Sequence, residues 1–154
     1  MKKTWIIPVV ALLFALGCGG KKAEKTLAPY FSLQDLSGQR VTIDNFKGKP
    51  FLLVFWATWC PTCRSEIPRL NKLTKEGHTV VAVALDRDRD KVARFVKEHR
   101  ILYTVLLGNY QVTIDYGNVR FLPTVFLIDP QGYIVGKMVG GIDQKRVEAF
   151  FKRG

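Results

Sequence analysis

Short apolar runs alternate with longer mixed stretches along most of the chain. Phe51–Trp56 holds six consecutive apolar residues, and Thr79–Leu85 is nearly as apolar. Runs this short and this apolar are typical of strands buried on both faces of a sheet. Further strands are predicted at residues 103–107, 124–128 and 133–139.

Between these strands, apolar residues recur at helical spacing. A helix is predicted to begin near Cys60, to present Ile67, Leu70 and Leu73 on one face, and to end at Gly77. Further helices are predicted at residues 91–100, 109–116 and 143–152.

The N-terminal part of the domain favours a hairpin. Residues 27–36 and 40–43 are predicted strands around a turn at 37–39, and a second turn at 129–132 joins the last two strands. Residues 86–90 alternate in charge sign, which is typical of a solvated loop leading into a helix. The element order is ββ, βαβα, β-(α)-ββα, which predicts an α/β sandwich with helices on both faces of a mixed sheet.

The first 17 residues have a different character from the rest. Lys2 and Lys3 precede a twelve-residue apolar run that ends at Leu16, and Gly17 follows. A basic head, a short apolar run and a small residue are typical of a secretory signal, and the run is too short to span a bilayer. A buried N-terminal helix is the alternative, which the charged residues 21–25 disfavour.

The end of this segment, Phe14-Ala15-Leu16-Gly17-Cys18, resembles a bacterial lipoprotein signal, although Ala15 stands where Leu is usual. The resemblance implies that Cys18 carries the lipid and begins the mature chain. A plain secretory signal with a free Cys18 is the alternative. The predicted organisation is a signal peptide at 1–17, a lipidated cysteine and tether at 18–26, and a domain at 27–154.

Composition sets outer limits on the function. A chain of 154 residues, 47% hydrophobic and 24% charged, is a globular domain rather than a disordered chain. Its formal charge of +11 raises nucleic acid or a membrane surface as partners. The basic residues are spread over 21–25, 87–100 and 145–153 instead of forming one stripe, so we expect no nucleic-acid partner.

Two of the three cysteines stand in Trp59-Cys60-Pro61-Thr62-Cys63, after a buried strand and at a helix start. A C-x-x-C pair in this position is typical of a thiol–disulfide redox site. The helix N-terminus favours the Cys60 thiolate, so Cys60 is the expected nucleophile and Cys63 the resolving thiol. An inert disulfide and a zinc site are the alternatives.

A structural zinc site needs four ligands, and one C-x-x-C pair supplies two. The two histidines, His78 and His99, are expected on the solvated surface. We therefore predict no metal and no organic cofactor beyond the redox-active disulfide.

The segment Phe55–Cys63 resembles the active site of the thioredoxin superfamily, and more narrowly its TlpA/ResA-like extracytoplasmic branch within the redoxin/AhpC-TSA-like group. The resemblance runs from about Ala28 to Phe151. It implies a three-layer α/β/α sandwich with an N-terminal β-hairpin extension, and Pro68 matches the proline inside the family's active-site helix. Leu122-Pro123 resembles the cis-proline loop that faces the dithiol and binds the substrate chain.

The same resemblance makes Trp59, Pro61 and Thr62 expected substrate contacts. Trp59 is also the residue expected to shield the dithiol. The alternative is that this ring and that of Trp56 serve only to pack the structure.

Three positions depart from the usual thioredoxin pattern. Val54 replaces the buried Asp that usually accepts protons, whereas Glu66, three residues after Cys63, matches the ResA-like branch. We expect Glu66 to move protons to and from Cys63; a surface Glu near a helix start is the alternative. Phe121 stands where relatives often have Gly, and we expect it to reshape the substrate groove.

The resemblance implies an enzyme: a lipid-anchored thiol–disulfide oxidoreductase of the bacterial cell envelope, facing the periplasm or extracytoplasmic space. Its expected substrates are disulfides of extracytoplasmic proteins, for example apocytochrome c. Its expected electron donor is a membrane thiol protein of the DsbD/CcdA kind, and it is expected to be a monomer.

Two other functions fit the same fold. A thiol peroxidase would need a Thr or Ser three residues before its reactive cysteine, and Thr58 stands two before Cys60. A copper chaperone would typically use C-x-x-x-C and a distant His, a spacing one residue longer than the one found here.

Overall fold

The computed structural model describes residues 25–153, so the predicted signal peptide and the predicted lipid attachment at Cys18 lie outside the described residues. The strands are β1 (Thr26–Leu27), β2 (Ser32–Asp35), β3 (Arg40–Thr42), β4 (Phe51–Trp56), β5 (Thr79–Ala84), β6 (Thr104–Leu107), β7 (Thr124–Ile128) and β8 (Tyr133–Val139). The helices are the 3-10 helix η1 (Ile43–Phe46), α1 (Pro61–Lys75), α2 (Arg89–Glu98), α3 (Tyr110–Asp115) and α4 (Gln144–Phe151). None of these helices is long and apolar enough to cross a bilayer.

The strands form one mixed sheet in the order β1-β8-β7-β4-β5-β6-β2-β3. β4, β5 and β6 are parallel, and Trp56 pairs with Ala84, which in turn pairs with Leu107. The carboxyl ends of these three strands therefore meet at one edge. β7 is antiparallel to β4 and its first residue, Thr124, pairs with Phe55. The segment before β7 thus reaches the same edge as the segment after β4.

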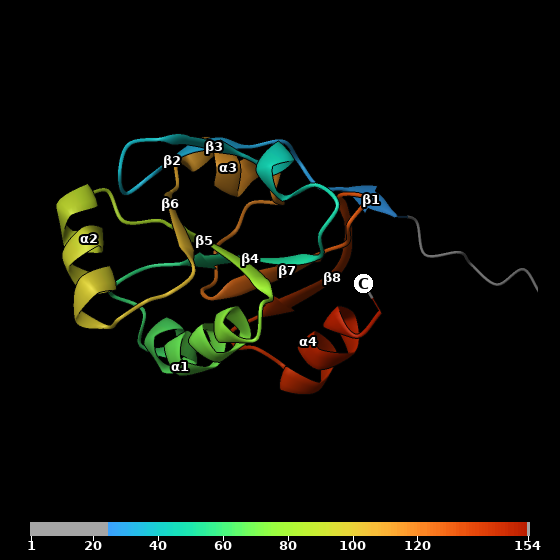
Figure 1. The fold of residues 1–154 in the computed structure, drawn as a ribbon. Helices are drawn as coiled ribbons and strands as arrows, with labels where there is room; N and C mark the ends of the chain where they lie inside the picture. The colour runs from blue at the N-terminus through green and yellow to red at the C-terminus, as the bar shows by residue number, and fades with distance from the viewer. Residues whose placement is uncertain (1–24, 154) are drawn as a thin grey trace, which may run out of the picture.

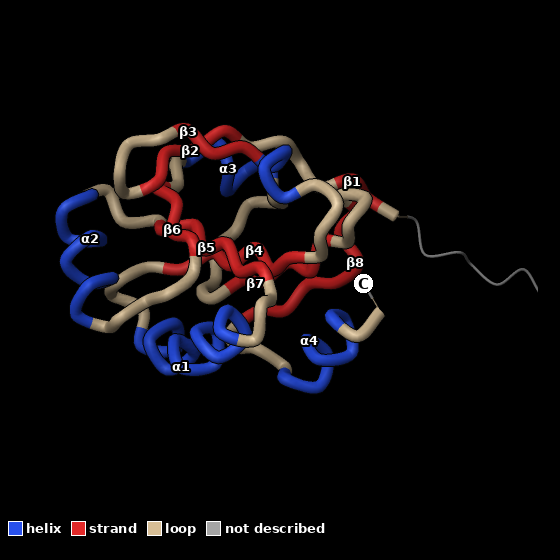
Figure 2. The backbone as a smooth tube through the Cα atoms, viewed as in Figure 1, coloured by secondary structure: helices blue, strands red, loops and turns tan. Residues whose placement is uncertain are grey.

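Helices cover both faces of the sheet, which confirms the predicted three-layer sandwich. α1 and α4 lie on one side, and α3 and η1 lie on the other (Figure 1). The six residues of β4 are all buried and alternate between the two sides, with Leu52 and Val54 in one apolar cluster and Leu53 and Phe55 in the other. Figure 2 shows the strands running through the middle of the molecule between these helices.

The predicted hairpin is present as β2 and β3, but the predicted first strand is too long. Residues 27–36 divide between β1 and β2, which lie in different parts of the sheet: β1 pairs with β8, and β2 pairs with β3 and β6. Pro29 falls in the break, and a proline has no N–H to donate to a strand ladder.

The loop after β5 is only partly as predicted. Asp88 caps α2 by accepting a hydrogen bond from Lys91 N at 3.0 Å, as expected of a helix start. Asp86 was expected to be solvated, which is wrong: its side chain is only 4% exposed. The reason is tertiary, because the segment before Cys60 folds over the end of β5 and covers Asp86.

Candidate active site

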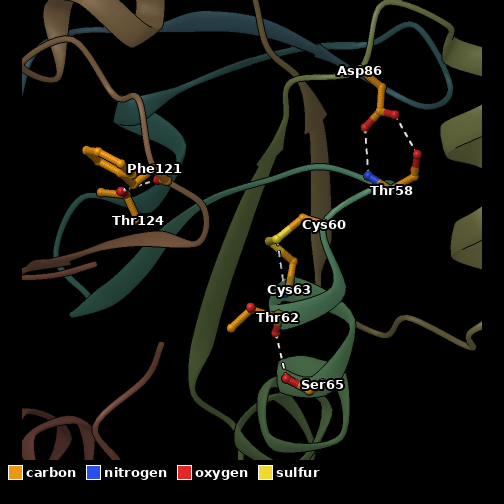
Figure 3. Close-up of a disulfide and its surroundings, with 8 residues drawn as sticks. All are labelled: Thr58, Cys60, Thr62, Cys63, Ser65, Asp86, Phe121 and Thr124. Atoms are coloured by element: carbon orange, nitrogen blue, oxygen red, sulfur yellow. Dashed lines mark hydrogen bonds between the residues drawn. A yellow bond between two sulfur atoms is a disulfide. The ribbon is translucent and has the colours of Figure 1, made fainter. Parts of the chain in front are cut away.

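The C-x-x-C pair lies at the N-terminus of α1, where Cys60 and Cys63 form a disulfide with their Cα atoms 5.3 Å apart (Figure 3). Cys60 is the N-cap of the helix and Pro61 opens its first turn. Cys63 N donates to Cys60 Sγ at 3.1 Å. A sulfur held by a backbone N–H at the positive end of a helix is placed where its thiolate would be stabilised.

The disulfide is nearly covered, and its exposed neighbours form the surface around it. Cys60 and Cys63 are each 5% exposed, whereas Trp59 is 62% exposed. Pro61 and Thr62 are exposed as well. The exposed surface next to the sulfur atoms therefore includes Trp59, Pro61 and Thr62, the positions predicted to contact substrate.

The loop before β7 lies at the same edge as the disulfide. The Leu122–Pro123 peptide bond is cis, and Pro123 lines a small cavity that Cys63 also lines. Pro123 O accepts from Gly140 N at 2.8 Å, and Phe121 O accepts from Thr124 Oγ1 at 2.7 Å. The N–H and C=O of Leu122 make no hydrogen bond with any described residue.

Phe121 is 70% exposed, and in Figure 3 its ring extends from the loop away from the disulfide. The ring therefore lies at the rim of the site instead of over the sulfur atoms.

Glu66 is not the surface residue that the alternative interpretation requires. Its side chain is 13% exposed. Its Oε1 accepts from Ile142 N at 3.1 Å, and Arg69 Nη1 lies 3.6 Å from its Oε2. Arg69 also donates to Ile142 O, so helix α1 and the loop before α4 are joined at this point. Glu66 also lines the small cavity beside Cys63.

Two aromatic residues border the same cavity. Burial raises the pKa of the Tyr103 phenol, which keeps this side chain neutral across the physiological range. Trp56 is almost fully buried, and its Nε1 has no hydrogen-bond partner in the described part of the chain. Glu66, Tyr103 and Trp56 thus border the same small cavity as Cys63.

Asp86 is the residue that sequence reasoning missed. Its Oδ2 accepts from Thr58 N at 2.9 Å and its Oδ1 accepts from Thr58 Oγ1 at 2.5 Å, as Figure 3 shows. The missed signal was topological: Asp86 follows a buried parallel strand, and the carboxyl ends of such strands share an edge with the dithiol.

The histidines lie away from the dithiol. His78 stacks on Phe151 and His99 on Phe95, with ring centroids 4.1 Å and 3.8 Å apart. Within residues 25–153, no three His, Cys, Asp or Glu side chains gather in a way that would hold a metal ion.

Comparisons with known proteins agree with this geometry. The chain is 35% identical over 131 residues to the thioredoxin-like protein YneN of Bacillus subtilis, covering 81% of this chain and 76% of that protein. It is 32% identical over 130 residues to the thiol-disulfide oxidoreductase ResA of Bacillus cereus, covering 82% of this chain and 75% of that protein. It is 34% identical over 164 residues to the thiol:disulfide interchange protein DsbE of Vibrio cholerae, covering 94% of this chain and 89% of that protein.

Among solved structures, a thioredoxin-family thiol:disulfide interchange protein from Chlorobium tepidum superimposes with a TM-score of 0.76. It is 31% identical, and the match covers 85% of this chain and 97% of that one. The Redoxin family model matches residues 22–150. The chain therefore belongs to the Redoxin family and has a thioredoxin-like fold.

Proposed function

We propose that this thiol–disulfide oxidoreductase reduces disulfides of extracytoplasmic proteins through its Cys60–Cys63 dithiol. The observation that carries the proposal is the disulfide at the N-terminus of α1, beside a loop whose Leu122 peptide unit is unpaired. A substrate chain that pairs with Leu122 would lie alongside the disulfide. The arrangement suits a polypeptide substrate better than a small molecule.

The reaction is an exchange of two electrons. The Cys60 thiolate attacks one sulfur of the partner's disulfide, which forms a mixed disulfide and releases the partner's first thiolate. The Cys63 thiolate then attacks Cys60 Sγ, which closes the Cys60–Cys63 disulfide and releases the second thiolate. The partner gains two electrons and two protons, and an external dithiol must reduce the enzyme again.

The proposed proton carrier is Glu66, acting on Cys63. Its support is that Glu66 and Cys63 border one small cavity. The hydrogen bond from Ile142 N fixes one carboxylate oxygen and leaves the other toward Arg69. Glu66 therefore has a fixed position from which to deprotonate Cys63.

Location and partners rest on the sequence. The basic head, apolar run and Gly17-Cys18 support a lipid anchor at Cys18 in the bacterial cell envelope. A chain held at a membrane and working as a reductant needs a membrane thiol donor, for which the DsbD/CcdA kind is the candidate. We propose that it acts as a monomer.

The test of direction is the reduction potential of the Cys60–Cys63 pair, measured by equilibration with glutathione. We expect a value near that of thioredoxin, about −270 mV. A value near that of DsbA, about −120 mV, would instead make the protein an oxidant and overturn the proposed direction.

The rival functions provide two control assays. The Thr58 hydroxyl donates to Asp86 at 2.5 Å, so its one donor hydrogen is already used. We expect the reduced protein to consume peroxide no faster than its Cys60→Ser variant.

Copper titration of the reduced protein is expected to leave its disulfide-reductase activity in place, and tight 1:1 binding without that activity would favour the chaperone.

A further inference from the structure

The segment that leads into Cys60 is tied to the end of β5 by a buried carboxylate. Asp86 accepts both the backbone N–H and the hydroxyl of Thr58, while its side chain is 4% exposed and that of Thr58 is buried. One residue earlier, Leu85 N donates to Trp56 O at 2.9 Å. Three hydrogen bonds therefore connect residues 56–58 to residues 85 and 86.

This connection reaches the nucleophile through a very short piece of chain. Cys60 N donates to Ala57 O at 3.2 Å, so residues 57–60 form a tight turn. Two peptide units separate Thr58 from Cys60, so their Cα atoms lie at most about 7.6 Å apart. A shift at Thr58 would move Cys60, and the Asp86 charge is bonded to a residue only two positions from the nucleophile.

We propose that Asp86 is a positioning residue for the dithiol and that its negative charge favours the disulfide form over the Cys60 thiolate. The proposal rests on the proposed function only in taking Cys60 as the thiolate-bearing cysteine. A carboxylate near a thiolate raises the free energy of the reduced state. The pair then has a lower reduction potential and becomes a stronger reductant, which is the direction proposed for this enzyme.

Other charges near this point set the size of the effect. Lys91 Nζ on α2 lies 3.8 Å from Asp86 Oδ1, and it is half exposed, so it offsets the carboxylate only in part. On α1, Glu66 borders Cys63, and its charge acts in the same direction as that of Asp86. Asp88 and Asp90 are exposed to solvent, which screens their effect on Cys60.

Asp86→Asn separates charge from geometry. The amide has the shape of the carboxylate, so its oxygen accepts from Thr58 N and its NH2 donates to Thr58 Oγ1. The reaction to measure is protein disulfide plus two glutathione thiols giving protein dithiol plus glutathione disulfide, at pH 8.5, where free cysteine ionises. We expect Asp86→Asn to raise this equilibrium constant about three- to tenfold. A tenfold rise corresponds to a reduction potential of the Cys60–Cys63 pair that is about 30 mV less negative.

The matched control is Asp90→Asn, which removes one negative charge from the same segment but at an exposed side chain. We expect its equilibrium constant to stay within about twofold of wild type. An unchanged constant in Asp86→Asn, or an equal change in Asp90→Asn, would overturn the role of the charge. Because the equilibrium exists for any C-x-x-C pair, a failed search for substrate proteins would leave this test intact.

Asp86→Ala tests positioning, since it removes both acceptors from Thr58. We expect it to slow the reaction of reduced Cys60 with a small aromatic disulfide about tenfold relative to Asp86→Asn, which lacks the same charge but keeps both bonds to Thr58. If Asp86→Ala does not fold, Thr58→Val, which removes only the hydroxyl hydrogen bond, takes its place. A wild-type rate in the variant that folds would overturn the positioning role.

Discussion

Two segments meet at the edge of the sheet where the chemistry takes place, and they are held in opposite ways. Residues 56–58, which lead to the dithiol, are buried and are bonded to the end of β5 through Asp86. The cis-proline segment is bonded at its ends, yet it leaves the Leu122 peptide unit unpaired and Phe121 70% exposed. One segment fixes the reacting atoms, and the other leaves backbone and apolar surface for a partner. Changes in the first should alter rate and potential, and changes in the second should alter binding.

The largest expected effect is in the dithiol itself. Cys60→Ser should lower disulfide-exchange activity at least about a thousandfold, because it removes the nucleophile and keeps the shape of the site. Cys63→Ser should instead accumulate a mixed disulfide at Cys60, visible by mass spectrometry after reaction with a disulfide-containing protein. If Cys63→Ser turned over like wild type, the assignment of the two sulfur atoms would be wrong.

The next effect concerns the proton supply behind the dithiol. Glu66→Gln should slow thiol–disulfide exchange about tenfold or more near neutral pH, since the amide cannot take the Cys63 proton. The measurement is the pH profile of the exchange rate, with Glu76→Gln, an exposed residue just after the same helix, as the matched control. Exchange kinetics like those of wild type across pH would leave Glu66 only its structural bond to Ile142 N.

A smaller effect is expected in the receiving segment. Phe121→Ala should raise KM for a protein disulfide about three- to tenfold, because an exposed ring is removed from the contact surface. It should leave kcat and the rate with a small disulfide close to wild type. A change in kcat or in reduction potential would contradict the view that the cis-proline segment affects only binding.

The smallest effect lies outside both segments, in the hairpin turn. Hydrogen bonds from the Ser37 hydroxyl, at 2.6 Å, and from the backbone N–H groups of Ser37 and Gln39 hold the pKa of Asp35 below its ordinary value of about 3.8. A lowered folded-state pKa stabilises the fold above the unfolded pKa, and this contribution disappears as pH falls through the folded one. Asp35→Asn should therefore flatten the acid limb of the Tm profile slightly, without changing exchange activity.

Much of the fold followed from local pattern. The apolar run Phe51–Trp56 indicated a strand buried on both faces, and the helix after Cys60 was predicted from its spacing of apolar residues. The division of residues 27–36 into β1 and β2 was not predicted. Both pieces have strand composition, and only the packing of β1 against β8, some hundred residues later, separates them.

The sequence by itself determined the identity of the reacting thiols and the helix that begins with them. These are local features, because a C-x-x-C pair and a helix start act within one turn of chain. Only the tertiary structure decided what surrounds the thiols. Asp86 is hydrogen-bonded to Thr58, Glu66 and Tyr103 line one cavity with Cys63, and the backbone N–H and C=O of Leu122 have no partner among the described residues. These contacts join residues up to 76 positions apart, as Glu66 and Ile142 are, and their burial depends on how the strands and helices pack.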